Sequence, residues 1–509
     1  MEEKKYNYQV YTPNDIAKDM AKKGIKLYFE INGRSETTLN KVRVCDLSCG
    51  SGNLLLPALE ELIILSKEIV GKYSYNPQWI TGFDINEEAV KITKLKIKEL
   101  LKHYSLEGES QVFTENGLLV EGGFNLILGN PPYLGEKNNK EIFQEIKNTD
   151  LGKKYYEAKM DYFYFFIEKA VEILDKNGVL VYLTTNYWLK ADSAKKLRRV
   201  LKEEGKFNEI IFYDNSLFSK AKGQHNIIFS WEKREEEREK IKIGTVEKRF
   251  NISNRDIYDE NLKLILADSE VREYNKRVLE ISNYKLKDLV NINQGIVSGC
   301  DEAFVFNEYK EEFKEYLKPF YKNKDVGKYT NEKNSFWILY LDRDSKLDEK
   351  LKEYLEKYYE KLSKRREVIF GQIQWWQLQW ARSKEIFSKP KILVRQRCKT
   401  NQFSYDEGEF YGSADIYFIT TKNEDINIFY ILGYMNSSSF FKWFKYNGKT
   451  KGKNYEFYST PLKETPIYYP DKKIEIEKIE RLVKKQLICY DEKIQREIDD
   501  YFIKIYIRE

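Results

Sequence analysis

Over the first half of the chain, short apolar runs of strand length alternate with longer segments whose apolar residues recur every three or four positions. The strand-like runs are Val42–Leu47, Trp79–Ile85, Phe124–Gly129 and Gly178–Thr184. The helical segments are Leu54–Leu65, Asp161–Leu174 and Ala194–Leu201. This alternation predicts βαβ units and a doubly wound α/β sheet. Two later runs, Phe207–Tyr213 and Asn226–Trp231, predict an antiparallel pair of strands.

The pattern changes at residue 286. From there to residue 470, short strand-like runs, glycine turns and polar–apolar alternation predict a mixed α+β domain. Helical spacing over 473–509 predicts a terminal helical hairpin, and the charged run over 232–243 predicts a solvated linker. We therefore expect an α/β domain over 1–240, a linker over 241–285, an α+β domain over 286–470 and a helical segment over 471–509.

Composition narrows the classes of function. The 509 residues carry a net charge of only +6, so a nucleic-acid surface would have to be local. Two histidines and five scattered cysteines argue against a zinc site and fit a reducing cytosol, so we expect no metal. We find no apolar signal segment and no run of 18 apolar residues, and we expect a cytoplasmic protein without a membrane span.

The run Phe124–Gly129 ends in Asn130-Pro131-Pro132-Tyr133. Two prolines stop a strand because they lack the N–H and fix φ, so this tetrapeptide is a rigid turn at the carboxyl edge of the sheet, where α/β folds bind ligands. The Asn130 amide oxygen and the Pro131 carbonyl are two acceptors, which suit an –NH2 group. The Tyr133 ring suits the flat system that carries this group. An ordinary proline-rich turn remains the alternative.

Other strand ends carry glycines and polar side chains. The stretch Asp46–Gly52 is a tight turn whose glycines let the backbone approach a ligand, and Asp46 suits a cationic amino group. Asp84 ends the next strand at the distance typical of a ribose-binding acid. Asn116 follows the third strand, where it suits an adenine edge. Helix caps and simple turns would explain each feature alone, but their joint order favours a nucleotide-like site.

These motifs resemble, in order, those of the S-adenosyl-L-methionine-dependent amino-methyltransferases. Asp46–Gly52 resembles motif I, Asp84 motif II, and Asn130–Tyr133 motif IV in its N6-adenine form. Asn116 stands at the motif III position, where the family usually has an aspartate. The helix start Thr12-Pro13 resembles motif X, which covers the methionine end of the cofactor. The resemblance implies a Rossmann-like methyltransferase domain that binds its cofactor through Thr12, Pro13, Asp46, Ser48, Gly50, Gly52, Asp84, Ile85, Asn116 and Asn130.

Two further segments belong to this expected active site. The polar, Lys-rich stretch 138–156 is expected to be a loop over the site. Between the last two predicted strands lies Phe218, an aromatic residue in a loop that contains Lys and Gly. Its position resembles motif VIII, whose aromatic residue stacks on the flipped target base. The resemblance therefore implies a catalytic set of Asn130, Pro131, Pro132, Tyr133 and Phe218.

Two basic stretches in the second half suggest a nucleic-acid surface. Residues 361–400 contain eleven Lys/Arg and two acids, with Trp375, Trp376 and Trp380 interleaved with glutamines. Basic side chains neutralise phosphates, and Arg and Gln make bidentate contacts to purine edges. The second stretch, Lys442–Lys453, has five lysines and no acid. A solvated Lys-rich surface is the alternative. The candidate DNA-binding residues are Lys364, Arg365, Gln377, Lys384, Arg395, Arg397, Lys449 and Lys451.

The region from residue 286 resembles the start of the recognition domain in methyltransferases like the TaqI enzyme. The order of the motifs is that of the gamma class. The resemblance thus implies a site-specific N6-adenine DNA methyltransferase that acts on double-stranded DNA, with a separate restriction endonuclease as a partner left open. Two alternatives remain. One is a methyltransferase that acts on a protein glutamine or on RNA, although glutamine methyltransferases have no need of a large basic C-terminal domain. The other is a non-catalytic DNA-binding specificity subunit, against which the intact set of cofactor motifs argues.

Overall fold

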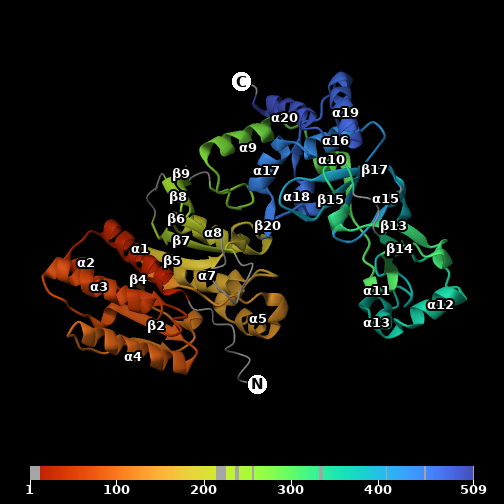
Figure 1. The fold of residues 1–509 in the computed structure, drawn as a ribbon. Helices are drawn as coiled ribbons and strands as arrows, with labels where there is room; N and C mark the ends of the chain where they lie inside the picture. Colours follow the sequence, from red (N-terminus) through yellow and green to blue (C-terminus); the bar gives the residue numbers. More distant parts are fainter. Residues whose placement is uncertain are drawn as a thin grey trace. The chain divides into compact units, whose positions relative to one another are not determined.

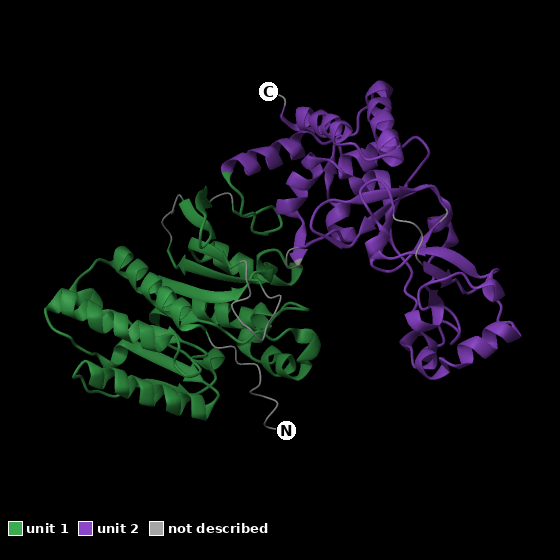
Figure 2. Cartoon of the chain, viewed as in Figure 1, with its two compact units in different colours: residues 1–268 green, residues 269–509 purple. Residues whose placement is uncertain are grey.

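The computed structural model describes residues 12–213, 225–234, 240–254, 257–331, 336–408, 410–451 and 454–507. The chain forms two compact units, residues 1–268 and 269–509 (Figure 2). None of the described helices is long and apolar enough to cross a membrane.

The first unit is built on a nine-stranded sheet in the order β3-β2-β1-β4-β5-β7-β6-β8-β9 (Figure 1). Its strands are β1 Val44–Asp46, β2 Ile80–Asp84, β3 Gln111–Thr114, β4 Phe124–Gly129, β5 Leu174–Thr185, β6 Lys206–Tyr213, β7 Asn226–Glu232, β8 Lys240–Thr245 and β9 Arg249–Ser253. The first five strands in the spatial order are parallel, and β7 lies antiparallel between β5 and β6. The predicted doubly wound sheet is therefore present, and the predicted antiparallel pair is β6 and β7.

Helices cover both faces of this sheet, because successive strand residues point to opposite sides. Val44, Leu126 and Leu128 pack with α1, α3 and α4 in one buried cluster. Cys45 and Ile127 pack in the other cluster with α5 to α8. The helices are α1 Asn14–Asn32, α2 Glu36–Lys41, α3 Leu55–Val70, α4 Glu87–His103, α5 Lys140–Lys147, α6 Asp150–Tyr155, α7 Phe163–Ile173 and α8 Lys195–Glu203.

The stretch 138–156, expected as a loop, instead contains helices α5 and α6. Its lysines conceal an apolar stripe, since Phe143, Ile146, Leu151 and Tyr155 are buried against α7. Burial of such a stripe, rather than composition, decides whether a segment with many charges forms a helix.

The segment 241–285, expected as a linker, is also structured. Strands β8 and β9 add two strands to the sheet, and α9 (Ser269–Ile281) begins the second unit. In β8, the exposed Lys240 and Lys242 alternate with the buried Ile241 and Ile243. This period of two is the pattern of a strand with one buried face, and the preceding charges conceal it in the sequence.

The second unit is a mixed α+β structure, as expected. Its three larger sheets have the orders β11-β19-β15-β17, β12-β14-β13-β18 and β16-β21-β20. Their strands are β11 Val290–Gln294, β12 Val305–Phe306, β13 Leu317–Tyr321, β14 Phe336–Leu339, β15 Lys391–Arg395, β16 Arg397–Cys398, β17 Phe403–Asp406, β18 Tyr411–Gly412, β19 Ile416–Thr421, β20 Lys449–Lys451 and β21 Asn454–Glu456. The short strands β10 Tyr284–Lys285 and β22 Pro466–Ile467 pair separately.

The helices of the second unit pack around these sheets. After α9 they are α10 Leu286–Leu289, α11 Asp301–Phe304, α12 Glu349–Glu356, α13 Tyr359–Ser363, α14 Arg366–Ile369, α15 Lys384–Ser388, α16 Ile428–Met435, α17 Ser438–Asn447, α18 Ser459–Lys463, α19 Lys473–Ile488 and α20 Glu492–Ile507. The last two form the predicted terminal hairpin, which buries Ile479, Val483, Ile498 and Phe502 in the same cluster as α16.

Candidate active site and recognition surface

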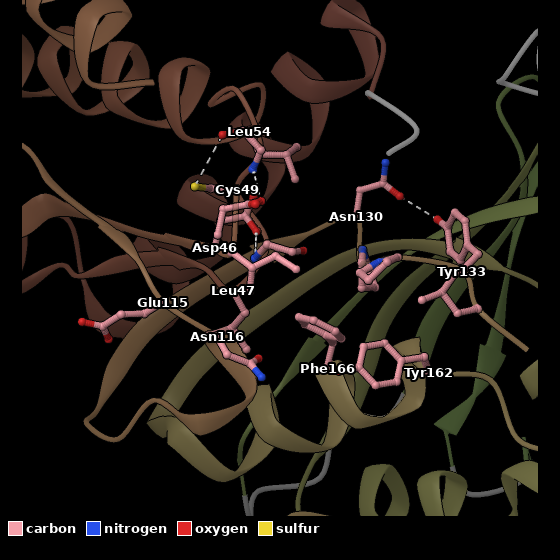
Figure 3. A pocket seen from close by; sticks show the side chains of 18 of the residues that line it. Asp46, Leu47, Cys49, Leu54, Glu115, Asn116, Asn130, Tyr133, Tyr162 and Phe166 are labelled. Atoms are coloured by element: carbon pink, nitrogen blue, oxygen red, sulfur yellow. Dashed lines mark hydrogen bonds between the residues drawn. The ribbon is translucent and has the colours of Figure 1, made fainter. Parts of the chain in front are cut away.

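The chain order of the strands places a crevice between β1 and β4. After β1 the chain proceeds to β2 and β3 on one side, and it returns to add β4 on the other. Ligands bind at such switch points, beyond the carboxyl ends of the strands. A cavity of about 390 Å³ lies there (Figure 3). It is lined by the expected residues Thr12, Asp46, Ser48, Gly50, Asp84, Ile85, Asn116, Asn130, Pro131, Pro132 and Tyr133.

The glycine turn after β1 is held by the two acids. Asp46 Oδ1 accepts a hydrogen bond from the Ser48 backbone N–H at 2.9 Å. Asp84 Oδ2 accepts one from the Gly50 N–H at 2.8 Å. Gly50 and Gly52 have φ values of 53° and 84°, in the left-handed region that favours glycine. A Cβ on Gly52 would also lie 2.9 Å from Thr93 Cγ2. Both glycines are therefore needed for the turn, in which Gly50 lines the cavity, whereas the expected residues Gly52 and Pro13 do not.

Two buried carboxyl groups in the cavity wall, Asp46 and Asp84, have no basic side chain as a partner within the described part of the chain. Burial raises the pKa of Asp46 to about 7, although the Ser48 N–H lowers it, and burial also raises the pKa of Asp84. No lysine or arginine among the described residues forms an ion pair with either carboxyl. A ligand with a cationic group near Asp46 and hydroxyls near Asp84 would supply what the protein does not.

The remainder of the cavity is largely apolar and suits a flat ring. Ile85 lines it with 55% of its surface exposed, which is unusual for a large apolar side chain. Phe166 and Tyr162, on and just before α7, line it as well. Asn116 Oδ1 accepts from the Leu118 N–H at 3.1 Å, which fixes the turn after β3. An ammonium, a ribose and an adenine would thus each find matching groups, so the residues fit S-adenosylmethionine.

Sequence reasoning missed the contribution of α7. The sequence predicted a helix over Asp161–Leu174 and no role for it in the site, yet Phe166 both packs in the core and lines the cavity. Ile142 and Glu145, from α5, were missed because that segment was expected to be a loop. The available signal was the aromatic run Tyr162–Phe166 directly after Asp161.

The Asn-Pro-Pro-Tyr turn presents an amide held at both ends. Asn130 Nδ2 donates to Thr12 Oγ1 at 3.1 Å. The Tyr133 hydroxyl donates to Asn130 Oδ1 at 2.7 Å, the bond drawn as a dashed line in Figure 3. The Tyr133 hydroxyl has a second acceptor, the Leu183 carbonyl at 2.9 Å. Two hydroxyl partners define the plane of the amide, so Asn130 is oriented before any substrate binds. Thr12, expected at the cofactor, thus also contacts the expected catalytic residue.

The backbone after this turn is fixed by the start of α7. Asp161 Oδ1 accepts from the Leu134 N–H at 3.0 Å, and the Tyr162 N–H donates to the Leu134 carbonyl at 2.9 Å. Burial raises the pKa of Asp161 to about 6 despite its backbone N–H donors. The Tyr133 ring packs edge-on against Phe163 with 5.6 Å between centroids. Phe218, the other expected aromatic residue, lies outside the described residues.

In the second unit, two expected DNA contacts are wrong as direct contacts because the side chains face inward. Arg365 is buried and donates to the carbonyls of Leu362, Ser298 and Trp375. Gln377 is buried, accepts from the Gln374 N–H and donates to the Asp342 carbonyl. Both side chains form hydrogen bonds to backbone groups of a loop-rich region. Such groups need side-chain partners when they are buried and are not paired in a β-sheet.

Other expected contacts remain accessible. Lys364, Lys384 and Arg397 are exposed and pair with Glu360, Asp342 and Glu456 respectively. The Lys364–Glu360 pair is exposed on both sides and therefore weak, whereas Asp342 and Glu456 are largely buried, each with 13% of the side chain exposed. Arg395, at the end of β15, is partly buried, and its Nε has no hydrogen-bond partner among the described atoms. Lys449 and Lys451 lie in β20.

Comparison with known families separates the chain into the same two parts. Residues 78–218 match the Eco57I restriction-modification methylase family. Residues 318–467 match the TaqI-like C-terminal specificity domain. The first match contains the Asn-Pro-Pro-Tyr turn, and the second contains the whole of the basic segment 361–400.

Individual relatives extend these matches over most of the chain. The type II methyltransferase M.HindII of Haemophilus influenzae is 25% identical, over 80% of this chain and 89% of its own length. The type II methyltransferase M.BstVI of Geobacillus stearothermophilus is 22% identical, over 95% of this chain and 94% of its own. The structure of the type IIL restriction-modification enzyme MmeI in complex with DNA superposes with a TM-score of 0.72 at 15% identity, over 97% of this chain and 76% of that chain, and so supports the fold.

The family matches, the relatives and the cavity agree on one chemistry. Methyl transfer needs a site for the methyl donor, and the residues of the crevice between β1 and β4 fit such a donor; site specificity needs a part that reads DNA, and residues 318–467 match a specificity domain. The chain is an S-adenosylmethionine-dependent, site-specific DNA methyltransferase, similar to the type II methyltransferases named above, in which a part that matches a methylase family precedes a part that matches a TaqI-like specificity domain.

Proposed function

We propose that the methyl group is transferred to the N6 amine of an adenine in double-stranded DNA. The observation that carries this proposal is the position of Asn130 and Pro131 on the cavity wall. An amide oxygen and a backbone carbonyl on one rigid turn can accept the two hydrogens of an exocyclic amine. The cofactor supplies an electrophilic methyl group when it is bound.

The amine of adenine is a poor nucleophile because its lone pair is delocalised into the ring. Hydrogen bonds from both N–H groups to Asn130 Oδ1 and the Pro131 carbonyl favour a localised lone pair on nitrogen. When the amine arrives, the Tyr133 hydroxyl can donate to the Leu183 carbonyl, its second acceptor at 2.9 Å. Catalysis then comes from positioning and electrostatics and needs no strong base in the first step.

The target base must leave the duplex to reach this cavity, which costs a few kcal/mol. The Tyr133 ring, and Phe218 by resemblance, are the proposed stacking partners, and stacking contributes about 1–3 kcal/mol per base in single-strand binders. Asp46 is proposed to hold the ammonium group of the cofactor, Asp84 its ribose hydroxyls, and Asn116 with Ile85 and Phe166 its adenine. The proposed location is the cytoplasm, and either a restriction partner or none is compatible with this function.

The test is the identity of the modified base. Purified protein, plasmid DNA and S-adenosylmethionine are incubated, and the digested nucleosides are separated by mass spectrometry. We expect N6-methyladenine, and none in the same reaction with Asn130→Ala. N4-methylcytosine as the product would leave a DNA methyltransferase but contradict the adenine assignment. In a parallel reaction with tritium-labelled S-adenosylmethionine and added RNA, label in protein or RNA alone would contradict the proposal as a whole.

A further inference from the structure

Arg382, in the second unit, has a backbone conformation that arginine rarely adopts. Its φ of 66° lies in the left-handed region, where a side chain larger than hydrogen is disfavoured. Such a conformation persists only where surrounding contacts determine it, and it is often associated with a functional position. The surroundings of Arg382 supply those contacts.

Three hydrogen bonds fix this residue. The Tyr340 hydroxyl donates to the Arg382 carbonyl at 2.8 Å. Arg382 Nε donates to the Gly295 carbonyl, and Nη2 donates to Gln294 Oε1, each at 3.1 Å. Gln294 is itself held, because its Nε2 donates to the Ala414 carbonyl at 2.9 Å. The guanidinium is therefore oriented in advance, which limits the entropy lost on binding a partner.

The guanidinium of Arg382 makes no ion pair within the described part of the protein. No described carboxylate lies within ion-pairing distance, in contrast to Lys384 and Arg397 nearby in the sequence. A guanidinium has five N–H donors, and two of them are used in the bonds above. Burial lowers the pKa of Arg382, which is the effect of partial desolvation of a cation. The remaining donors are available to an acceptor that the chain does not provide.

Arg382 lines a cavity of about 530 Å³ whose walls suit a base edge better than a phosphate. Four carboxylates and, with Arg382, three cations line the same cavity, so its lining carries no net positive charge that would attract a phosphate: Asp342, Asp344, Glu367 and Glu385 beside Arg343 and Lys384. Gln372 and Gln379 line it too, and Trp380 contributes an indole with 43% exposure. A contact to phosphate needs only a basic side chain that reaches the DNA backbone, and it carries no sequence information. The polar and aromatic groups of this cavity are instead suited to a base.

We propose that Arg382 is a specificity-determining residue that recognises a guanine of the target site through its major-groove acceptors. Guanine offers O6 and N7, which match the two-pronged donor geometry of a guanidinium. The proposal rests on the DNA methyltransferase function and goes beyond it by assigning one base contact to one side chain. It does not depend on which base is methylated.

The first test compares the methylated motifs of the wild type and of Arg382→Gly. Glycine accepts a φ of 66° without strain, so this variant removes the side chain and preserves the backbone. Each protein is expressed in a host without DNA methylation, and plasmid DNA is read by long-read sequencing. We expect the wild-type motif to contain a G·C pair at which Arg382→Gly loses about tenfold in preference, while the other positions are unchanged.

Arg382→Lys retains the charge but not the forked geometry of the guanidinium. We expect it to lose preference at the same base pair of the motif as Arg382→Gly. The matched control is Arg343→Ala, which removes an exposed arginine from the same cavity and should leave the motif unchanged. Cooperative thermal unfolding of the full chain and its resistance to limited proteolysis within residues 269–509 should match the wild type in all three variants, which checks that the second unit is folded. If Arg382→Gly fails this folding control, Arg382→Lys decides.

Three outcomes would overturn the assignment. One is a wild-type motif without a G·C pair, and another is a motif that both variants leave intact. The third is a uniform loss at all sites with a salt slope reduced by about one, which identifies a phosphate contact. A motif with a different modified base would contradict the adenine proposal and leave this one intact, so the two failures are distinguishable.

Discussion

Most of the site residues predicted from the sequence gather in one cavity in the first unit. Those predicted in the basic segment 361–400 of the second unit do not gather in one place. In the first unit, motif residues from the ends of β1, β2, β3 and β4 line one cavity. In the second unit, Arg365 and Gln377 support the interior, and exposed cations such as Lys384 pair with neighbouring acids.

This difference has a physical origin. The strand ends of a parallel sheet converge at a switch point, so sequence order alone brings the polar residues there together. No comparable rule gathers side chains in the loops of the second unit. Charge density there identifies a surface, but only hydrogen bonds and burial identify which side chains are available to DNA.

The largest effects are expected from substitutions in the cavity, where one residue should affect catalysis and another should affect cofactor binding. Asn130→Ala should lower kcat at least about 100-fold, because it removes an oriented acceptor from the transition state, and should change cofactor affinity little. Asp84→Ala should do the reverse and weaken S-adenosylhomocysteine binding about 10- to 100-fold. Calorimetry and single-turnover methylation measure the two.

The control for both is Asn125→Ala, which removes an amide from the same strand at a site outside the cavity, where Asn125 binds Asp175. It should alter neither quantity. Equal loss of cofactor binding in Asn130→Ala and Asp84→Ala would show that the cavity is one unit without the proposed division of roles.

A smaller effect concerns pH. Asp46 is protonated below its pKa of about 7, and the neutral acid cannot attract the ammonium group of the cofactor. Affinity for S-adenosylhomocysteine should therefore fall as pH decreases below 7, by up to about tenfold per pH unit. Asp46→Asn should bind weakly with no such slope. A wild-type affinity that is constant from pH 5.5 to 8, about one unit on either side of that pKa, would exclude this role of Asp46.

The smallest effect concerns the second unit. Lys364→Ala and Lys384→Ala should each reduce the slope of DNA affinity against salt by about one and leave the methylated motif unchanged. The matched control is Lys91→Ala, which removes an exposed lysine of α4 that is also paired with glutamates. If the control lowers the slope as much as the two variants do, the basic segment has no special relation to DNA.

Much of the first unit could be predicted from the sequence, because its elements have strong periodic patterns. The expected strand at Phe124–Gly129 is β4, and the glycine turn follows β1 where expected. The wrong predictions of secondary structure lie where many charged residues obscured the spacing of the apolar residues. Lys-rich α5 was expected to be a loop, and β8 was expected to be a linker, although Phe143 and Ile241 are fully buried.

The candidate site could be predicted only in part. The residues at the strand ends were identified because their position follows from topology. Phe166 was not, because a residue that packs in the core and also lines a cavity has the same sequence pattern as an ordinary core residue. Arg382 could not be distinguished from ten other basic residues in 361–400 without its backbone conformation and partners.

The cofactor cavity is built entirely from the first third of the chain, which is synthesised first. All residues that line it lie between Thr12 and Phe166, and the strand that completes the parallel part of the sheet, β5, ends at Thr185. Because domains tend to fold as units in the order of their synthesis, the first unit can fold on the ribosome while the second is still being translated. A ligand that binds only the folded state stabilises it. S-adenosylmethionine is thus available as a folding aid to the nascent chain before the part that selects DNA exists.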